Sequence, residues 1–231
     1  MERFPTSEPL YSKFLFLISK VKVNGEVELR AAARVRESDR VEVKSSAPYV
    51  SRGGEKLAHA LDSFGIRVSD KVVLDTGAST GGFTDCLLQR GARRVYAVDA
   101  GYNQLDYRLR QDPRVINMEH VNARYPFELP EKIDLVTLDL SFISLRKVLP
   151  NVLLFFHQPR IAVALFKPQF EAEKVEVGKG GIIRDPQVHA RILGRFVFWL
   201  ASVDLRLRGL IRSPIKGSSG NSEFLLHLTD W

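Results

Sequence analysis

Two lysines and two acidic residues stand beside apolar or glycine-rich segments, where charged side chains are uncommon unless they have partners. They are Lys56, Asp139, Lys167 and Glu223. Lys167 directly follows the apolar run 161–166, which is typical of a buried strand. An interleaved set of opposite charges could surround one reacting hydroxyl group, or it could form two ordinary ion pairs. Spacing alone supports both interpretations equally.

The chemistry that suits such a set is the transfer of a methyl group to a hydroxyl oxygen. That oxygen must lose its proton, and a partly buried lysine beside a second cation could remove it. The two acidic residues would then fix the orientation of the lysine and the protonation of the whole set.

A glycine-rich loop follows the apolar run 72–74 and marks a candidate ligand site. Residues 75–85 read DTGASTGGFTD. This spacing is neither the G-x-G-x-x-G of a dinucleotide site nor the Gly-Lys-Ser/Thr of a phosphate loop. Because ligands of parallel sheets bind at the carboxyl ends of the strands, the loop is predicted to hold a ligand that has no pyrophosphate.

Asp99 ends the next apolar run, 95–98. A carboxylate at this place can accept hydrogen bonds from both hydroxyls of a ribose. Strand, glycine loop, helix, strand and acid together indicate an adenosyl ligand. S-adenosylmethionine fits, because its positive sulfonium and amino groups suit a pocket near Asp75. The alternative is that Asp99 caps a turn and that the glycines are structural.

A parallel sheet would bring these residues together. After residue 48, short apolar runs alternate with helical segments, which indicates a parallel sheet covered on both faces. The predicted strands cover 72–75, 95–99, 115–118, 133–139, 161–166, 205–211 and 224–228, and the predicted helices cover 82–89 and 187–203. The last two strands are close enough in sequence to pair antiparallel. We therefore predict an α/β fold.

A small β-rich module is predicted before this sheet. Residues 21–27 and 39–43 alternate apolar and polar side chains, and Asn24-Gly25 is typical of a hairpin turn. Residues 45–48, Ser-Ser-Ala-Pro, are typical of a linker. The predicted domains are therefore 1–46 and 47–231.

Composition and charge limit the functional classes. The 231 residues are 45% hydrophobic and carry a net charge of +7, which describes a globular protein that could meet a polyanionic partner. The basic excess is concentrated in residues 1–60 and 174–216. The single cysteine, Cys86, lies in an apolar stretch and is expected in the core. The apolar run 14–18 is too short to span a bilayer, so a cytoplasmic protein is expected.

Seven stretches of the sequence closely resemble the TlyA-type ribosomal RNA methyltransferases, the haemolysin A family, which belong to the FtsJ-like (RrmJ) 2′-O-methyltransferases. They are YVSRGGEKL at 49–57, LDTGASTGGFTDCLLQRGA at 74–92, DAGY at 99–102, NARY at 122–125, DLSFISL at 139–145, LFKPQFE at 165–171 and GNSEF at 220–224. The resemblance implies a Rossmann-like methyltransferase fold, with a mostly parallel seven-stranded sheet, helices on both faces and an antiparallel last strand. It also implies S-adenosylmethionine as cofactor.

The resemblance further implies a role for each site residue. Lys56, Asp139, Lys167 and Glu223 would form a catalytic tetrad. Lys167 would help to deprotonate or orient a ribose 2′-hydroxyl, Asp139 and Glu223 would hold Lys167 in place, and Lys56 would add positive field beside the developing alkoxide. The cofactor site would fall on Asp75, Gly77, Ala78, Ser79, Gly81, Gly82, Phe83, Asp99 and Asn122, although Asn122 could equally be a turn residue.

An S4-type RNA-binding module normally precedes the catalytic domain in this family, and residues 21–43 resemble its β half. The usual first helix of the module has no match in residues 1–20, so a partial S4-like module is expected in domain 1–46. The expected partner is ribosomal RNA or a ribosomal subunit, in which a target cytidine is exposed or flipped. Its phosphates would be met by Arg30, Arg34, Arg36, Arg40 and Arg52.

The leading hypothesis is an RNA (ribose-2′-O-)methyltransferase. Three alternatives remain: a methyltransferase of small molecules or proteins, a non-catalytic RNA- or ribosome-binding protein that retains the fold, and a haemolysin-type activity. The presence of all four tetrad residues favours catalysis over binding alone. The lack of a long apolar or amphipathic membrane segment disfavours a pore. No metal site is expected, and the sequence predicts no particular oligomeric state.

Overall fold

Residues 21–30, 33–36, 38–43 and 47–231 are described by a computed structural model. The expectations for residues 1–20 therefore lie outside the described part of the chain. The chain divides into two compact units, Met1–Ala47 and Pro48–Trp231, and each unit is described by itself.

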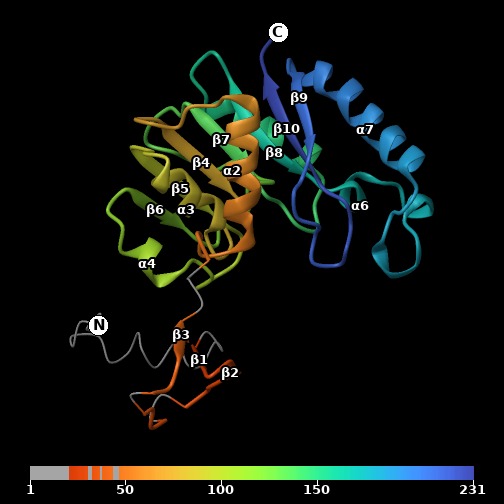
Figure 1. The fold of residues 1–231 in the computed structure, drawn as a ribbon. Helices are drawn as coiled ribbons and strands as arrows, with labels where there is room; N and C mark the ends of the chain where they lie inside the picture. Colours follow the sequence, from red (N-terminus) through yellow and green to blue (C-terminus); the bar gives the residue numbers. More distant parts are fainter. Residues whose placement is uncertain (1–20, 31–32, 37, 44–46) are drawn as a thin grey trace. The chain divides into compact units, whose positions relative to one another are not determined.

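The smaller unit contains a three-stranded antiparallel sheet in the order β2-β1-β3 (Figure 1). Its strands are β1 (Val21–Val23), β2 (Glu26–Val27) and β3 (Val41–Val43). Asn24 and Gly25 join β1 to β2, and both have the positive φ angles that a type I′ hairpin turn requires. The predicted hairpin is confirmed, whereas its assignment to half of an S4 module stays a prediction.

A seven-stranded sheet, in the order β6-β5-β4-β7-β8-β10-β9, is the centre of the larger unit (Figure 1). The strands are β4 (Val72–Thr76), β5 (Arg94–Val98), β6 (Val115–Met118), β7 (Leu135–Leu138), β8 (Ile161–Phe166), β9 (Arg206–Arg212) and β10 (Phe224–Thr229). Strands β4 to β8 pair in parallel, and β10 lies antiparallel between β8 and β9. The predicted α/β fold with an antiparallel last strand is confirmed.

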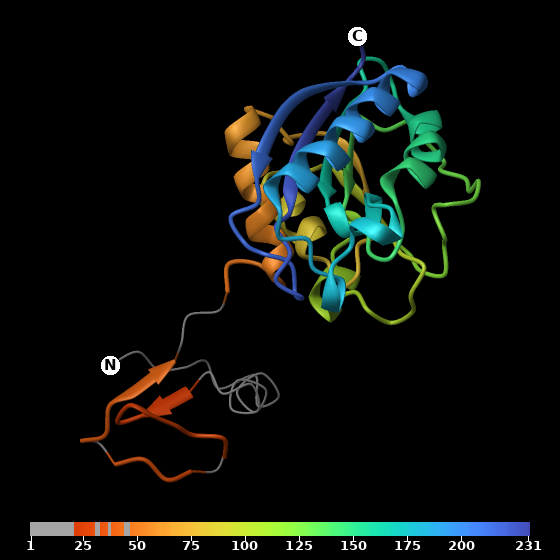
Figure 2. The ribbon, with the colours of Figure 1, turned by 90° about the vertical axis from the view of Figure 1, so that its right-hand side faces the viewer.

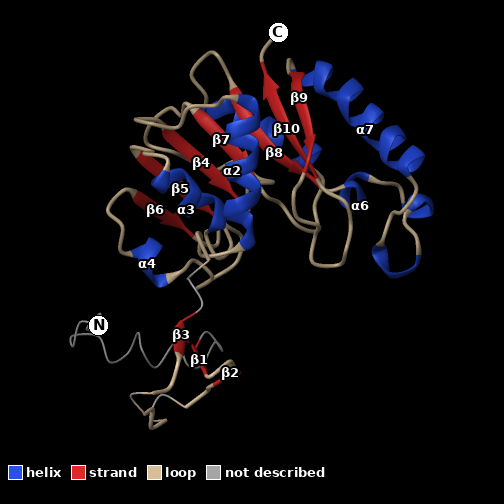
Figure 3. Cartoon of the chain, viewed as in Figure 1, coloured by secondary structure: helices blue, strands red, loops and turns tan. Residues whose placement is uncertain are grey.

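Helices connect most of these strands (Figure 3). The α-helices are α2 (Arg52–Phe64), α3 (Gly82–Gln89), α4 (Tyr107–Arg110), α5 (Leu149–Val152), α6 (Pro168–Glu171) and α7 (Pro186–Leu200). The short 3-10 helices are η1 (Leu145–Lys147), η2 (Leu153–Phe155), η3 (Lys174–Glu176), η4 (Lys179–Gly181) and η5 (Ala201–Val203). Within the described ranges, no helix is both long and apolar enough to cross a membrane.

The helices cover both faces of the sheet, with α2 and α3 on one face and α5 and α7 on the other (Figure 2). Strand β8 shows why both faces need cover, because Val163 packs toward α2 and α3 whereas Ala164 packs toward α5 and α7. Helix α7 buries Ile192, Phe196 and Leu200, which recur at helical spacing and form its apolar stripe.

The strand order reverses beside β4, because β5 and β6 extend the sheet on one side and β7 and β8 on the other. Ligands of such sheets bind in the crevice beyond the carboxyl ends of the strands at this switch point. The glycine loop begins where β4 ends, and Asp139 follows the end of β7. The fold thus places the two candidate motifs on opposite sides of one crevice.

Helix α2 was not identified by the sequence pattern, which placed Lys56 only before the first strand of the sheet. The helix begins with Arg-Gly-Gly, and glycine disfavours helix formation. It is nevertheless well bounded, because the Ser51 side chain accepts from Gly53 N at its start and Gly65 adopts φ +65° at its end. Cys86 lies in the core as predicted, and burial raises the pKa of its thiol to about 12.

Candidate active site

All four residues of the predicted tetrad line one cavity of about 430 Å³, here called the tetrad cavity. Lys56 projects from α2, Asp139 follows β7, Lys167 follows β8 and Glu223 precedes β10. Because β10 is antiparallel to β8, its start lies beside the end of β8, with Phe224 opposite Phe166. The sheet topology therefore brings together residues that are far apart in the sequence.

The tetrad consists of two short ion pairs. Lys167 Nζ lies 2.7 Å from Asp139 Oδ1 and donates a hydrogen bond of 3.0 Å to Ser141 Oγ. Lys56 Nζ donates a hydrogen bond of 2.6 Å to Glu223 Oε2. The two lysine side chains are each 11% exposed and that of Glu223 is 3% exposed. Charges buried to this degree need partners, so the two charged groups of each pair hold one another in place.

The partner of Glu223 differs from the one that the family resemblance implies. Glu223 was expected to hold Lys167, but its carboxylate pairs with Lys56 instead. The reason is that Glu223, which immediately precedes β10, faces the side of the sheet that α2 covers. Leu225, two positions further along, faces the same side and packs in the same core cluster as Leu57 of α2. Lys167 is left with Asp139 and Ser141 as its partners.

Glu171 connects the segment that carries Asp139 to the segment that carries Lys167. Its carboxylate accepts hydrogen bonds from Ser144 Oγ at 2.5 Å and from Leu145 N at 2.6 Å. Burial raises the pKa of Glu171. Because Asp139 and Lys167 begin these two segments, the clamp made by Glu171 supports the ion pair between them.

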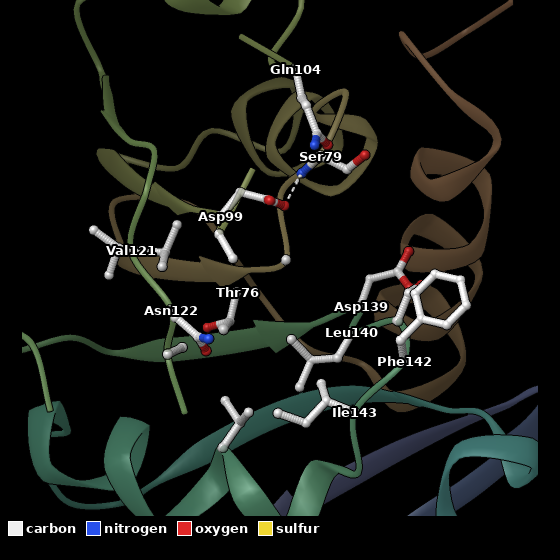
Figure 4. A pocket seen from close by; sticks show the side chains of 16 residues that line it. Thr76, Ser79, Asp99, Gln104, Val121, Asn122, Asp139, Leu140, Phe142 and Ile143 are labelled. Carbon is white, nitrogen blue, oxygen red and sulfur yellow. Dashed lines mark hydrogen bonds between the residues drawn. The ribbon is translucent and has the colours of Figure 1, made fainter. Parts of the chain in front are cut away.

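A second cavity, of about 440 Å³, adjoins the tetrad cavity and is here called the Asp99 cavity. Four residues line both cavities and form their shared wall: Gly77, Ser79, Asp139 and Ser141. In Figure 4, the side chains of Asp99 and Gln104 lie at one end of the Asp99 cavity, and those of Asp139 and Phe142 lie at another. One end of the Asp99 cavity thus holds a carboxylate beside the glycine loop, and the other end borders the tetrad cavity.

Backbone hydrogen bonds fix the carboxylate of Asp99. It accepts from Ser79 N at 2.8 Å and from Gly101 N at 2.7 Å (Figure 4). Thr76 also lines this cavity, and although the residue is completely buried, its Oγ1 has no hydrogen-bond partner among the described residues. A buried hydroxyl without a partner has unused hydrogen-bonding capacity for a ligand.

Gly77 allows the two backbone segments that form the shared wall to lie close together. It has φ +83°, and a Cβ added to it would lie 2.6 Å from the backbone carbonyl oxygen of Asp139. Only glycine adopts this conformation readily and permits so close an approach. The glycine loop therefore contacts the residue after β7 through backbone atoms.

A model of the FtsJ-like methyltransferase family matches residues 49–229. The chain belongs to the FtsJ-like methyltransferase family.

Individual relatives agree with this assignment. YqxC of Bacillus subtilis, provisionally described as an rRNA methyltransferase, is 52% identical over 183 residues, which are 78% of this chain and 65% of YqxC. TlyA of Mycobacterium tuberculosis, a 16S/23S rRNA (cytidine-2′-O)-methyltransferase, is 43% identical over 90% of this chain and 80% of its own length. A solved structure from Streptococcus thermophilus, provisionally described as a hemolysin, has a TM-score of 0.78 at 40% identity and covers 94% of this chain and 81% of its own. The resemblance found in the sequence motifs is confirmed.

The predicted cofactor residues of this FtsJ-like methyltransferase fall into three groups. Gly77, Ser79, Asp99 and Asn122 line the Asp99 cavity. Ala78, Gly82 and Phe83 line the tetrad cavity, as do Gly77 and Ser79. Gly81 and Asp75 line neither cavity. A ligand in the Asp99 cavity would therefore contact the first part of the glycine loop, whereas Gly81 serves the turn into α3 with φ +96°.

Asp75 supports the glycine loop from beneath rather than facing either cavity. It is completely buried, and its two oxygens accept hydrogen bonds from Thr84 Oγ1 at 2.7 Å and Thr137 Oγ1 at 2.8 Å. These bonds connect β4 to α3 and to β7. Burial raises the pKa of the Asp75 carboxyl to about 6, and the two threonine hydroxyls partly oppose that shift.

The raised pKa of Asp75 predicts a pH-dependent stability. In the folded protein the carboxyl keeps its proton up to about pH 6, whereas the ordinary value is 3.8. Its stabilising contribution is therefore complete below the unfolded pKa and is lost as the pH rises through the folded pKa. Urea unfolding between pH 4 and pH 7 should show wild type losing roughly 2 kcal/mol relative to Asp75→Asn. Parallel stability curves for the two proteins would contradict the assignment.

The predicted RNA contacts lie in both units. Arg52 begins α2 and lines the tetrad cavity. Arg30, Arg34, Arg36 and Arg40 belong to the smaller unit and are exposed. Arg30 pairs with Glu28, and Arg40 pairs with Glu42. Their contacts with RNA stay predictions.

Sequence reasoning missed several residues that line the two cavities. They include Thr76, Gln104, Val121, Leu140, Ser141, Phe142 and Ser218. Phe142 carried the clearest available signal, because it stands three positions after Asp139 in a quoted motif. It has φ +64° and is 91% exposed, which is unusual for a phenylalanine. Among the described residues, no group of His, Cys, Asp and Glu side chains could hold a metal ion.

Proposed function

We propose that this protein transfers a methyl group from S-adenosylmethionine to the ribose 2′-hydroxyl of a cytidine in ribosomal RNA. The observation that carries the proposal is the pair of adjoining cavities, one holding a fixed carboxylate and the other holding two lysine–carboxylate pairs. The substrate class is supported by the 43% identity to an enzyme named as a 16S/23S rRNA (cytidine-2′-O)-methyltransferase.

The Asp99 cavity fits S-adenosylmethionine in size and in chemistry. Its volume of about 440 Å³ lies within the range of small-molecule sites, roughly 300–1,000 Å³. Asp99 would accept hydrogen bonds from the ribose hydroxyls, and Thr76 Oγ1 offers a buried polar group that has no described partner. When bound, the cofactor supplies a methyl group attached to a positive sulfur.

The tetrad cavity would hold the ribose that accepts the methyl group. Lys167 Nζ would donate a hydrogen bond to the 2′-oxygen and stabilise the negative charge that develops there, while the hydroxyl proton would pass to the carboxylate of Asp139, which lines the same cavity. Asp139 and Ser141 restrict where that ammonium group can lie. The Lys56–Glu223 pair adds a second fixed ammonium group on the wall of the same cavity. The protein thus contributes positioning and charge at the acceptor oxygen.

The surroundings of the tetrad cavity suit a nucleotide that has left its helix. Phe142, which lines the adjoining Asp99 cavity, stands exposed beside Asp139 and contacts Phe170, with ring centroids 5.4 Å apart. An exposed aromatic ring offers a flipped base a surface for stacking. Arg52, on the wall of the tetrad cavity, would meet a phosphate of the RNA.

Labelled methyl transfer is the direct test of the proposed function. Purified ribosomal subunits and the protein would be incubated with methyl-labelled S-adenosylmethionine, and the RNA would then be hydrolysed in alkali. Methylation of a 2′-hydroxyl leaves an alkali-resistant linkage, whose position can be mapped. Label that appears in protein or in alkali-sensitive nucleotides would instead favour a different acceptor.

Asp99→Ala is expected to weaken S-adenosylmethionine binding by roughly tenfold to a hundredfold, because hydrogen bonds to a charged group are lost. The rate at saturating cofactor should change much less, since Asp99 lies away from the tetrad cavity. Calorimetric titration and initial rates measure the two effects. Asp106→Ala is the matched control, because Asp106 caps α4 and lines neither cavity. Unchanged cofactor affinity in Asp99→Ala would refute the ribose assignment.

A further inference from the structure

A third cavity, of about 400 Å³, lies between the start of α7, the edge strand β9 and the neighbouring strand β10. Its polar lining comes from Arg184, His189, Arg212 and Ser222, and its apolar lining includes Leu193 and Phe224. This combination of guanidinium groups with an aromatic wall is not explained by the two cavities of the proposed active site.

The charge of this third cavity is positive and uncompensated. Neither Arg184 nor Arg212 forms an ion pair with any acidic side chain in the described part of the chain, and no acidic residue lines the cavity. The two arginines of α7 provide a contrast, because Arg191 and Arg195 both pair with Glu176. The cavity thus carries two guanidinium groups that have no acidic partner among the described residues.

Ring groups form the wall between these arginines. His189 and Phe224 make an edge contact, with ring centroids 5.8 Å apart. His189 Nε2 is shielded from solvent and has no hydrogen-bond partner among the described residues. Arg212 Nη2 donates a hydrogen bond of 3.0 Å to Ser222 Oγ, which holds the guanidinium beside the ring wall. The cavity therefore combines two guanidinium groups with two ring surfaces and a ring nitrogen that has no described hydrogen-bond partner.

The two walls of the cavity are joined by Asn221, which is 2% exposed. Asn221 Oδ1 accepts from Ile183 N at 3.0 Å, and Asn221 Nδ2 donates to Gly181 O at 2.9 Å. These bonds attach the segment before Arg184 to the segment that carries Ser222. The cavity is therefore built into the fold before any ligand binds.

The third cavity lies next to the tetrad cavity along the chain but on the other side of the sheet. Side chains alternate along a strand, so Ser222 and Phe224 line the third cavity whereas Glu223 between them lines the tetrad cavity. Both cavities lie at the edge of the sheet where β10 begins. An RNA strand whose target nucleotide occupies the tetrad cavity could continue around this edge of the sheet to the third cavity.

We propose that the third cavity binds a single-stranded nucleotide of the substrate RNA that flanks the methylated nucleotide. Arg184 and Arg212 hold its phosphate, and the His189–Phe224 wall receives its base. This inference rests on the proposed RNA substrate and adds a second point of contact that would fix the register of the strand.

Binding measurements with the full-length protein test the arginines. A short single-stranded RNA and purified ribosomal subunits serve as probes, with salt varied for each. The double variant Arg184→Ala/Arg212→Ala should bind about tenfold more weakly, and its slope of log affinity against log salt should fall by about one. The matched control is Arg67→Ala/Arg208→Ala, which removes two exposed arginines that line none of the three cavities. A double variant that binds RNA like this control overturns the proposal.

His189→Ala tests the base contact separately. Loss of a stacking surface should weaken RNA binding severalfold without changing the salt slope, because no phosphate contact is removed. If the cavity takes free phosphate and not RNA, inorganic phosphate will protect against thermal unfolding only when both arginines are present, and RNA binding will be unchanged in every variant. That outcome also overturns the proposal.

Failure of the proposed function would be recognised independently. Wild-type protein that binds RNA but leaves no alkali-resistant linkage refutes 2′-O-methylation, and the binding series still decides the role of the third cavity. Wild-type protein that methylates RNA while the arginine variants retain control-level affinity refutes only the third cavity.

Discussion

Replacing Lys167 with alanine is expected to reduce methyl transfer by roughly a thousandfold while S-adenosylmethionine still binds. Lys167 lines the tetrad cavity, with Nζ 2.7 Å from Asp139 Oδ1, and it is the group that we propose contacts the acceptor oxygen. It does not line the Asp99 cavity, so cofactor affinity should remain within about twofold of wild type. Single-turnover transfer to ribosomal subunits and calorimetric titration of the cofactor measure the two quantities.

Two further variants make the Lys167 experiment specific. Lys147→Ala removes an exposed lysine that lines neither cavity and should leave the transfer rate unchanged. Lys167→Arg keeps the charge but replaces a compact ammonium with a wide planar group, so it should recover little activity. If Lys167→Ala transfers methyl groups at the wild-type rate and has the same free energy of unfolding as wild type, the role given to Lys167 is wrong.

Gly77→Ala is expected to impair both cavities and to lower the free energy of unfolding by about 2–4 kcal/mol. The added Cβ would lie 2.6 Å from the carbonyl oxygen of Asp139 and 3.1 Å from its carbonyl carbon, and these are backbone atoms that cannot rotate away. Asp139 would have to move, and its contact with Lys167 would be disturbed. Urea unfolding, cofactor titration and transfer rate should all worsen together.

Gly65→Ala separates crowding from backbone strain. Gly65 also has a positive φ, +65°, but an added Cβ there would meet no atom within 4 Å. This control should cost only the strain of the left-handed conformation, about 1–2 kcal/mol, and should leave cofactor binding intact. Equal losses in the two variants would mean that the close approach of Gly77 to Asp139 has no energetic importance.

The sheet was predictable because its strands carry strong local signals. The strands predicted at 115–118 and 161–166 match β6 and β8 at both ends. The short helices α4, α5 and α6 were not predicted, since four residues are too few to show helical periodicity. The predicted helix 187–203 is α-helical only to Leu200 and continues as η5, which is a boundary that no residue type marks.

The candidate site was predictable in its members but not in its contacts. The motifs identified all four tetrad residues, because each stands at the end or start of a strand or in a distinctive glycine-rich segment. Which lysine meets which carboxylate depends on the faces that α2 and β10 present, and spacing does not reveal those faces. Asp75 shows the same limit, because a strand-end acid can face a ligand or the threonines of neighbouring elements.

The partition formed by Gly77, Ser79, Asp139 and Ser141 has a consequence for enzymology. These residues border both cavities at once. If the Asp99 cavity holds the methyl donor and the tetrad cavity the acceptor, as proposed, kinetic constants measured on their variants will report both reactants together and cannot be apportioned to one of them. Clean attribution requires positions that line a single cavity: Asp99 in the proposed donor cavity and Arg52 in the proposed acceptor cavity.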